Sequence, residues 1–198
     1  MIAATITDGL TRCAWLGDNP LMLAYHDEEW GVPVHDDLRH FEFLVLDAFQ
    51  AGLSWAIVLK KREGFRKALD GFDPKKIARY TKRSVERLVK DAGIIRNRQK
   101  IEATINNAKV FLRIQEEFGS FDEFVWRLAG GKTKRNRWRT LEQLPASTKQ
   151  SDQMSKALKE RGFKFVGSTI CYAYMQAAGM VNDHIVKCFR YEELGGKG

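Results

Sequence analysis

A histidine and a cysteine lie four residues apart near the end of the chain, as His184 and Cys188 in the stretch "NDHIVKC". On a helix this spacing would place both side chains on one face, where they could bind the same metal ion. Two ligands do not make a zinc site, however, and a free cysteine is more often a small buried apolar residue. The pair indicates a metal site only if the chain supplies two more ligands.

The best candidates for those two ligands are Cys13 and His26, near the other end of the chain. With the C-terminal pair they would form a closed tetrahedral Cys2His2 set, the arrangement of structural zinc, which leaves no position for a reactive water. His35 and His40 lie in a charged helix start without a matching cysteine, and we expect them at the surface. From spacing alone, a ligand set divided between the two chain ends is a weak pattern.

Composition limits the class of protein that could carry such a site. The chain has 198 residues, 44% of them hydrophobic, which is enough for the core of one globular domain. No stretch approaches the roughly 20 apolar residues of a membrane span, and the N-terminus lacks the pattern of a secretory signal. The three cysteines are an odd number and make a disulfide framework improbable. We therefore expect a cytoplasmic, monomeric protein with no membrane partner.

The net charge of +8 suits a partner that carries phosphates. One basic run, "KTKRNRWR" at residues 132–139, contains five Lys or Arg residues and no acidic residue. A solvated surface loop is the favoured interpretation of this run, and an added contact to DNA phosphate is the alternative.

Helix signals dominate the elements that must position these residues. In "DDLRHFEFLVLDAFQAG" apolar residues recur with a period of 3.6, and Gly52 ends the helix before Ser54 can cap the next one. Capping and periodicity also predict helices in "FDPKKIA", "SVERLVKDAG", "RNRQKIEATINNAKVFLRIQEEFG", "SFDEF", "SDQMSKALKERG" and "STICYAYMQAAG". No segment alternates with a period of two. The sequence predicts an all-α fold with about eight short helices.

One junction between helices could bind DNA. In "LVKDAGIIRNRQKI" a short turn contains Gly93 and is followed by Arg96 and Arg98. Such a turn can present backbone N–H groups and a helix N-terminus to a phosphate. From spacing alone, an ordinary helical hairpin is the favoured interpretation.

Four blocks of the chain together resemble the DNA-3-methyladenine glycosylase I family of bacterial alkylation-repair enzymes. They are "CAWLGDNPLMLAYHDEEWGVP", "QAGLSWAIVLKKRE", "LVKDAGIIRNRQKI" and "SKALKERGFKFVGSTICYAYMQAAGMVNDHIVKC". The resemblance implies a helix-hairpin-helix glycosylase that acts on double-stranded DNA containing alkylated adenine. It also implies one structural zinc, held by Cys13, His26, His184 and Cys188, that ties the chain ends together.

The resemblance sets the expected limits of the domain. It covers the chain from Cys13 to Cys188, so we expect a single glycosylase domain of two closely packed helical lobes at residues 13–190. Residues 1–12 would then form an N-terminal extension and residues 191–198 a C-terminal tail.

The implied chemistry is capture of a damaged base. Methylation at N3 leaves adenine cationic and weakens its bond to the sugar, so the enzyme must chiefly flip the base from the stack and hold it. Electron-rich aromatic faces attract a cationic ring. Tyr25 and Trp55 are the favoured catalytic walls of the pocket, with Trp15 and Trp30 as further base-binding candidates. Core packing is the alternative for each of the four.

Two positions depart from the family pattern. Asp47, eight residues before Trp55, stands where the family has a glutamate, and its shorter side chain could contact the base through water or favour a slightly different lesion. Met22 stands where relatives can have a tyrosine, which predicts a less aromatic pocket on that side.

The turn after Asp47 is the candidate for filling the hole that a flipped base leaves. Leu53 could act as an apolar wedge and Gln50 as a polar one, although Leu53 could equally be a core residue. No lysine lies in an apolar setting that would lower its pKa, so we expect release of the base without a Schiff base. The rival functions are a zinc-bearing DNA-binding module without excision activity and, more remotely, a zinc hydrolase.

Overall fold

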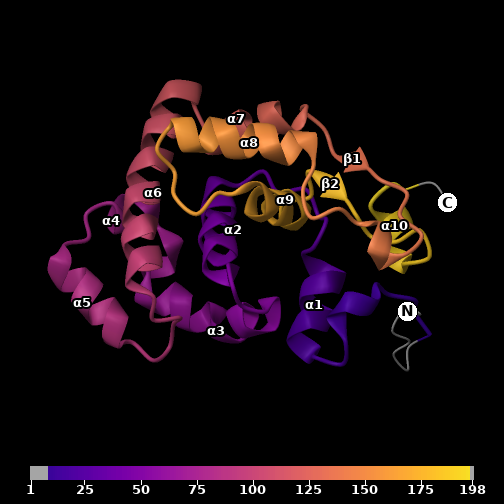
Figure 1. Ribbon diagram of the computed structural model, residues 1–198, viewed down its shortest axis with the longest axis horizontal. Coiled ribbons are helices and arrows are strands. Elements are labelled where there is room, and N and C mark those ends of the chain that lie inside the picture. Colours follow the sequence, from indigo (N-terminus) through magenta and orange to yellow (C-terminus); the bar gives the residue numbers. More distant parts are fainter. Residues whose placement is uncertain (1–8, 197–198) are drawn as a thin grey trace.

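The computed structural model describes residues 9–196, and helices make up most of it (Figure 1). The α-helices are α1 (Pro20–Glu28), α2 (Asp37–Gln50), α3 (Trp55–Ala68), α4 (Pro74–Ile77), α5 (Lys82–Lys90), α6 (Arg98–Phe118), α7 (Phe121–Ala129), α8 (Lys149–Glu160), α9 (Ser168–Ala177) and α10 (Phe189–Glu193). Short 3-10 helices span Ala14–Leu16, Asp70–Phe72 and Leu141–Gln143. No helix within residues 9–196 is both long and apolar enough to cross a membrane.

The all-α prediction is confirmed, with ten α-helices within residues 9–196 where about eight were expected. Side chains at the predicted caps accept backbone N–H bonds at the starts of several helices, as Asp73 does for α4 and Ser120 does for α7. The structure adds two strands that the sequence did not predict, β1 (Lys134–Arg135) and β2 (Val181–Asn182), which pair in parallel. Two residues are too few to show an alternating pattern.

Helix α2 runs through the centre of the molecule and packs against α3, α6, α7 and α9. Its Phe41 ring contacts Phe111 of α6, which in turn stacks on Phe121 of α7 with ring centroids 4.2 Å apart. All three rings are fully buried. This packing fixes α2, whose C-terminal turn carries Asp47 and Gln50.

The turn between α5 and α6, residues 91–97, is held against α3 by a close backbone approach. A Cβ atom on Gly64 would lie 2.2 Å from the carbonyl oxygen of Gly93, so only glycine fits at this position of α3. The candidate DNA-binding turn is therefore fixed relative to the helix that begins at Trp55.

Both ends of the described chain lie on the same side of the molecule (Figure 1). The Phe189 amide donates to the carbonyl of Thr11, and the Arg12 guanidinium pairs with Asp27 at 2.8 Å. Tyr191 is fully buried. The packed chain thus extends beyond residue 190 and begins before residue 13, whereas residues 1–8 of the expected extension lie outside the described residues.

Candidate active site and metal centre

The four predicted metal ligands meet in one buried cluster, with their ligand atoms all within 4.8 Å of one another. Sγ of Cys188 lies 3.5 Å from Nε2 of His26 and 3.4 Å from Nδ1 of His184. Sγ of Cys13 lies 3.8 Å from the same Nδ1 atom. Ligands about 2.0–2.3 Å from a tetrahedral zinc would be roughly 3.3–3.8 Å apart. The donor set therefore fits a zinc ion.

The outer nitrogens of the two imidazoles make hydrogen bonds that orient the rings. Nδ1 of His26 lies 2.7 Å from a carboxylate oxygen of Asp27, and Nε2 of His184 lies 2.9 Å from the carbonyl of Trp30. Both partners are acceptors, so the outer nitrogen of each ring donates, and the inner nitrogen faces the thiols. Metal-binding histidines are typically held in this way.

His184 and Cys188 lie on a turn, in which the Cys188 amide donates to the carbonyl of Ile185. One expectation about the histidines is wrong. His40 is completely buried and not at the surface, because its ring bonds to the Tyr174 hydroxyl at 2.7 Å and to Asp122 at 2.9 Å. His35 is exposed as expected.

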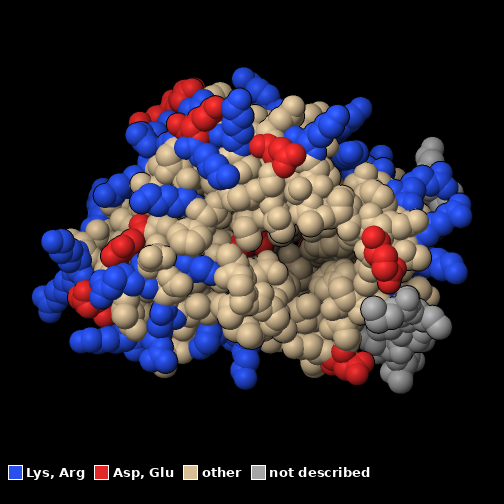
Figure 2. Space-filling view, in the orientation of Figure 1, with Lys and Arg blue, Asp and Glu red and all other residues tan. Residues whose placement is uncertain are grey.

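A cavity of about 200 Å³ opens between α1, α2, α3 and α9 and forms the central hollow in Figure 2. Drug-sized ligands usually occupy about 300–1,000 Å³, so this cavity suits a smaller molecule such as a single base. Its lining residues are Trp15, Tyr25, Trp30, Asp47, Gln50, Trp55, Leu144, Ala173 and Gln176. The structure thus brings together all five predicted pocket residues and Gln50.

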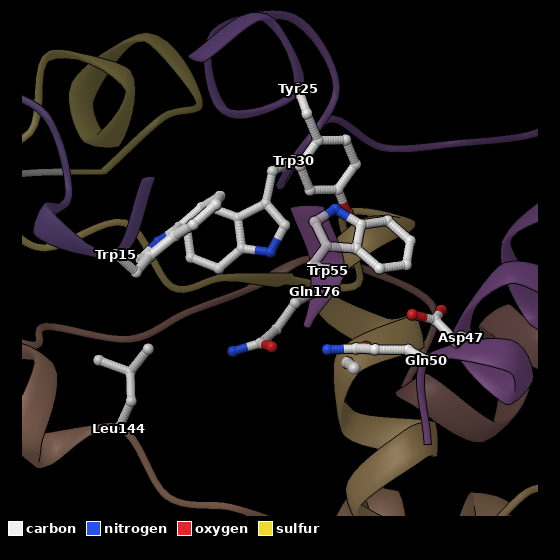
Figure 3. A pocket seen from close by; sticks show the side chains of 9 residues that line it. Trp15, Tyr25, Trp30, Asp47, Gln50, Trp55, Leu144 and Gln176 are labelled. Atoms are coloured by element: carbon white, nitrogen blue, oxygen red, sulfur yellow. The ribbon is translucent and has the colours of Figure 1, made fainter. Parts of the chain in front are cut away.

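Aromatic side chains form one wall of the cavity (Figure 3), and the Trp30 ring lies 4.6 Å from the ring of His184 in the Cys/His cluster. The Tyr25 and Trp55 rings are 5.2 Å apart, and the Trp15 and Trp30 rings are 5.0 Å apart. Tyr25 precedes the cluster residue His26 in α1, so one turn of helix contributes to both the cavity and the cluster. The four-residue cluster therefore lies directly beside the aromatic wall.

Asp47 reaches the cavity from α2, opposite Trp15 in Figure 3. Asp47 is 2% exposed, and its Oδ2 atom has no hydrogen-bond partner among the described residues. Burial raises the pKa of this carboxyl well above its ordinary value. Burial also raises the pKa of Tyr25, and the nearby Asp47 adds to that shift. Burial thus favours the protonated form of both groups in the free protein.

Two more buried polar atoms at the cavity lack partners within the described chain, the indole N–H groups of Trp15 and Trp55. Buried donors and acceptors are usually paired, so unpaired ones at a cavity mark a place for a ligand. The cavity offers one acceptor and two donors between aromatic faces. Met22, by contrast, is buried but does not line the cavity.

The turn between α2 and α3 presents Leu53 at the surface, with 39% of the residue exposed. This exposure removes the core interpretation of Leu53. The turn is held by Lys100 of α6, whose ammonium donates to the carbonyls of Phe49 and Ala51 at 2.9 and 2.6 Å. Burial lowers the pKa of Lys100, contrary to the expectation that no lysine is so placed. Lys100 does not line the cavity, and its two carbonyl partners stabilise the protonated form.

The hairpin turn is only partly free to bind phosphate. Gly93 is exposed, but its amide donates to the Asp91 side chain at 2.7 Å. Arg98 pairs with Glu86 at 2.9 Å, whereas Arg96 is exposed and forms no ion pair with a described carboxylate. Arg96 is the better placed of the two predicted arginines.

Sequence reasoning missed the opposite side of the cavity, formed by Leu144, Ala173 and Gln176. Gln176 donates to Asp183 at 2.8 Å, and Asp183 directly precedes His184 of the Cys/His cluster. Gln176 lies near the C-terminal end of α9, just before the turn at Ala178 and Gly179.

Comparison with known proteins decides the family. The model of the methyladenine glycosylase family matches residues 15–191. The chain is 51% identical to DNA-3-methyladenine glycosylase 1 of Escherichia coli K12 over 182 residues, which cover 92% of this chain and 97% of that one. The protein belongs to the methyladenine glycosylase family.

Solved structures agree with this assignment. A crystal structure of 3-methyladenine DNA glycosylase I superposes with a TM-score of 0.89 at 50% identity, covering 90% of this chain and 98% of that chain. A second structure, a tyrosine-to-phenylalanine variant of the enzyme in complex with 3-methyladenine, gives a TM-score of 0.87 at 35% identity and covers 90% and 96% of the two chains. The cavity described above thus lies in a methyladenine glycosylase fold.

Proposed function

We infer that this glycosylase excises 3-methyladenine from alkylated DNA by hydrolysing the N-glycosidic bond, which leaves an abasic site. One observation carries the inference beyond family membership. A cavity that suits a single base holds three unpaired buried polar atoms between aromatic faces: Asp47 Oδ2, Trp15 Nε1 and Trp55 Nε1. An adenine base can donate from its amino group and accept at its ring nitrogens, which complements this set.

The reaction needs little acid catalysis, because the methylated base is already a cationic leaving group. The main work is to flip the base out of the duplex, at a cost of a few kcal/mol that is smaller for a damaged base. Trp55 and Tyr25 then stack on the cationic ring, each contact contributing roughly 0.5–2 kcal/mol. Water replaces the base at the sugar carbon and completes the hydrolysis.

Asp47 provides the charge that favours the cationic base. Burial raises the pKa of its carboxyl and so favours the protonated form, whereas a cation in the cavity favours the ionised form. Binding of the cationic base therefore shifts this carboxyl toward ionisation. A neutral, undamaged adenine offers no such compensation, which gives selectivity for the lesion. Asp47 in place of a longer glutamate reaches less far into the cavity.

No lysine lines the cavity, and the buried Lys100 is held by two carbonyls. We therefore propose release of the base without a Schiff base, so that the DNA strand stays intact.

One zinc ion would be held by Cys13, His26, His184 and Cys188. With four protein ligands it would supply a cross-link between the chain ends and no bound water for the reaction. The chain's own contribution here is positional, since Trp15, Tyr25 and Trp30 each lie within four residues of a ligand or bond to one.

The partner is duplex DNA, bound by a monomer. Gln50 and Leu53 at the α2–α3 turn would enter the stack beside the flipped nucleotide. The turn around Gly93, with Arg96 and Arg98, would contact the backbone.

Release of free 3-methyladenine from methylated duplex DNA tests this function directly. We expect release of the free base with the strand uncut until alkali is added. A protein that binds the duplex but releases no base would be a DNA-binding module without excision activity. Strand cleavage without alkali would instead require a lysine nucleophile.

A further inference from the structure

Hydrogen bonds attach the basic run at residues 132–139 to the rest of the fold. Its backbone pairs with β2 and the following turn, with the Lys134 amide donating to Met180 at 2.9 Å and the Val186 amide donating to Trp138 at 2.8 Å. The Thr133 hydroxyl donates to the Gly179 carbonyl at 2.7 Å. The expectation of an ordinary surface loop is therefore not met.

A buried carboxylate joins this run to the base cavity. Asn136 and Trp138 both donate to Oδ1 of Asp183 at 2.7 Å, while Tyr172 and the cavity residue Gln176 donate to its Oδ2. Asp183 is 1% exposed. The Asp183 side chain therefore fixes the position of the basic run relative to the cavity.

The residues of the run that face the protein interior differ in chemistry from those that face the solvent. Thr133, Asn136 and Trp138 are partly buried and make the contacts above. All five cations are exposed, and we call them the β1 strip: Lys132, Lys134, Arg135, Arg137 and Arg139. No residue of the strip forms an ion pair with a carboxylate in the described chain, although Arg135 donates to the Leu194 carbonyl. Like charges gathered without counter-charges repel one another, so an anionic partner would stabilise this arrangement.

The strip lies across the cavity from the hairpin. Figure 2 shows Lys and Arg side chains on two sides of the hollow, over α3, α5 and the start of α6 on one side and over the β1 and C-terminal region on the other. The surface directly around the hollow is largely uncharged. Leu144, five residues beyond Arg139, lines the cavity itself. A duplex that delivers a base to the cavity would extend toward both basic regions.

We propose that the β1 strip is a second phosphate-binding surface, which contacts the DNA backbone on the side of the flipped nucleotide opposite the hairpin. The proposal depends on the proposed function in one respect: it assumes that the flipped nucleotide enters the cavity. Because the strip is fixed before binding, it adds affinity without a large ordering cost. Backbone contacts position the duplex and do not select the lesion.

The test compares two triple variants that each remove three positive charges. The strip variant is Lys132→Gln, Lys134→Gln and Arg137→Gln, which keeps Arg135 and every buried anchor. The control carries Lys109→Gln, Lys156→Gln and Lys159→Gln, three exposed lysines of α6 and α8. Equal melting temperatures for both variants and the unmodified protein establish that the folds are intact.

Binding to undamaged duplex is measured from 50 to 200 mM salt. In the strip variant the slope of log affinity against log salt should fall by up to about 0.9 for each DNA phosphate that the variant no longer neutralises. For each such phosphate, affinity at 50 mM salt would then drop about 3.5-fold more than affinity at 200 mM salt. The control should keep the slope of the unmodified protein. Equal slopes for the strip variant and the unmodified protein, or equal decreases in both variants, would overturn the proposal.

A duplex with a central abasic analogue, shortened stepwise on one side only, locates the phosphates that the strip binds. The unmodified protein should lose affinity when either side is shortened. The strip variant should become insensitive on one side, and unchanged sensitivity on both sides would contradict the proposal. These measurements involve no excision, so failure to release 3-methyladenine would refute the proposed function and leave the strip to be judged by its own data.

Discussion

The metal cluster and the base cavity lie side by side, but they differ in whether their buried polar groups are hydrogen-bonded. In the cluster both imidazoles use their outer nitrogens, one toward Asp27 and the other toward the Trp30 carbonyl. In the cavity, the described residues leave Asp47 Oδ2 and two indole N–H groups without partners. Paired buried groups hold a fold together, whereas unpaired ones reduce its stability by about 1–3 kcal/mol each. The difference indicates that the cluster serves stability and the cavity serves a ligand.

Replacing a metal ligand should give the largest effect on stability. Cys188→Ala removes one of four ligands, and loss of a bound metal is among the changes that lower the free energy of unfolding by roughly 4 kcal/mol or more. For a chain of this size the melting temperature should fall by about 10 °C or more. Metal analysis should show zinc in the unmodified protein and little in the variant.

Cys171→Ala provides the control for this change, because Cys171 is also buried and free but lies outside the cluster. It should keep the metal and lose only about 1–2 kcal/mol of stability. If Cys188→Ala abolished excision while its melting temperature stayed unchanged, the assignment of the cluster to stability would be wrong.

Asp47→Asn should separate activity from stability. The change removes the negative charge that faces the cationic base, and a hydrogen bond to a charged group contributes about 1.5–3 kcal/mol, so excision should slow roughly 10- to 150-fold. Asp152→Asn, at an exposed carboxylate of α8, is the matched control and should excise normally. Unchanged excision in Asp47→Asn would exclude this carboxylate from the mechanism.

The stability of the same variant should depend on pH in a defined direction. Because burial raises the pKa of Asp47, the folded protein retains a proton that the unfolded chain releases above about pH 4. The stability of the unmodified protein therefore falls as the pH rises from there through the folded-state pKa, and Asp47→Asn does not show this decrease. Its melting temperature should exceed that of the unmodified protein at pH 7.5, with the difference vanishing near pH 4.

Trp55→Ala should reduce excision because it removes a stacking surface for the base. Base–aromatic stacking contributes about 1–3 kcal/mol, which corresponds to roughly a 5- to 150-fold slower reaction. Trp55→Phe keeps a ring and should recover much of the rate. Trp126→Phe removes an indole whose N–H is already bonded to the Val34 carbonyl, so it should lower stability and leave excision unchanged. Normal excision by Trp55→Ala would show that Trp55 contributes to packing and not to base binding.

The sequence was sufficient for the helical class, and the structure gathers the four predicted metal ligands and four pocket residues that the family blocks contain, together with Asp47, which precedes one block. Capping residues such as Asp73 and Ser120 have local effects, so their roles could be predicted without knowing the fold. Motif spacing could also place Tyr25 and His26 on successive positions of one helix, although it could not show that they serve different sites.

The features that could not be predicted depend on approaches between distant segments. His40 looked like a surface residue because its neighbours are charged, and only the approach of Tyr174 and Asp122 buries it. Lys100 is buried because α6 crosses the end of α2. The two-residue strand at Lys134 forms by pairing with a segment 47 positions away, so no local sequence pattern predicts it.

The smallest expected effect concerns Leu53, which lies at the edge of the cavity region and outside the core. With 39% of the residue exposed, Leu53→Ala should change the free energy of unfolding by no more than about 0.5 kcal/mol. As an apolar wedge in the hole left by a flipped base, however, its removal should slow excision about fivefold, corresponding to roughly 1 kcal/mol less burial energy. Leu38→Ala, at a leucine of similar exposure near the far end of α2, should leave both quantities unchanged. Single-turnover excision from duplex and from single-stranded DNA distinguishes the outcomes, because a wedge is needed only where a stacked partner strand must be kept apart. Equal slowing on both substrates would show that Leu53 contacts the DNA without acting as a wedge.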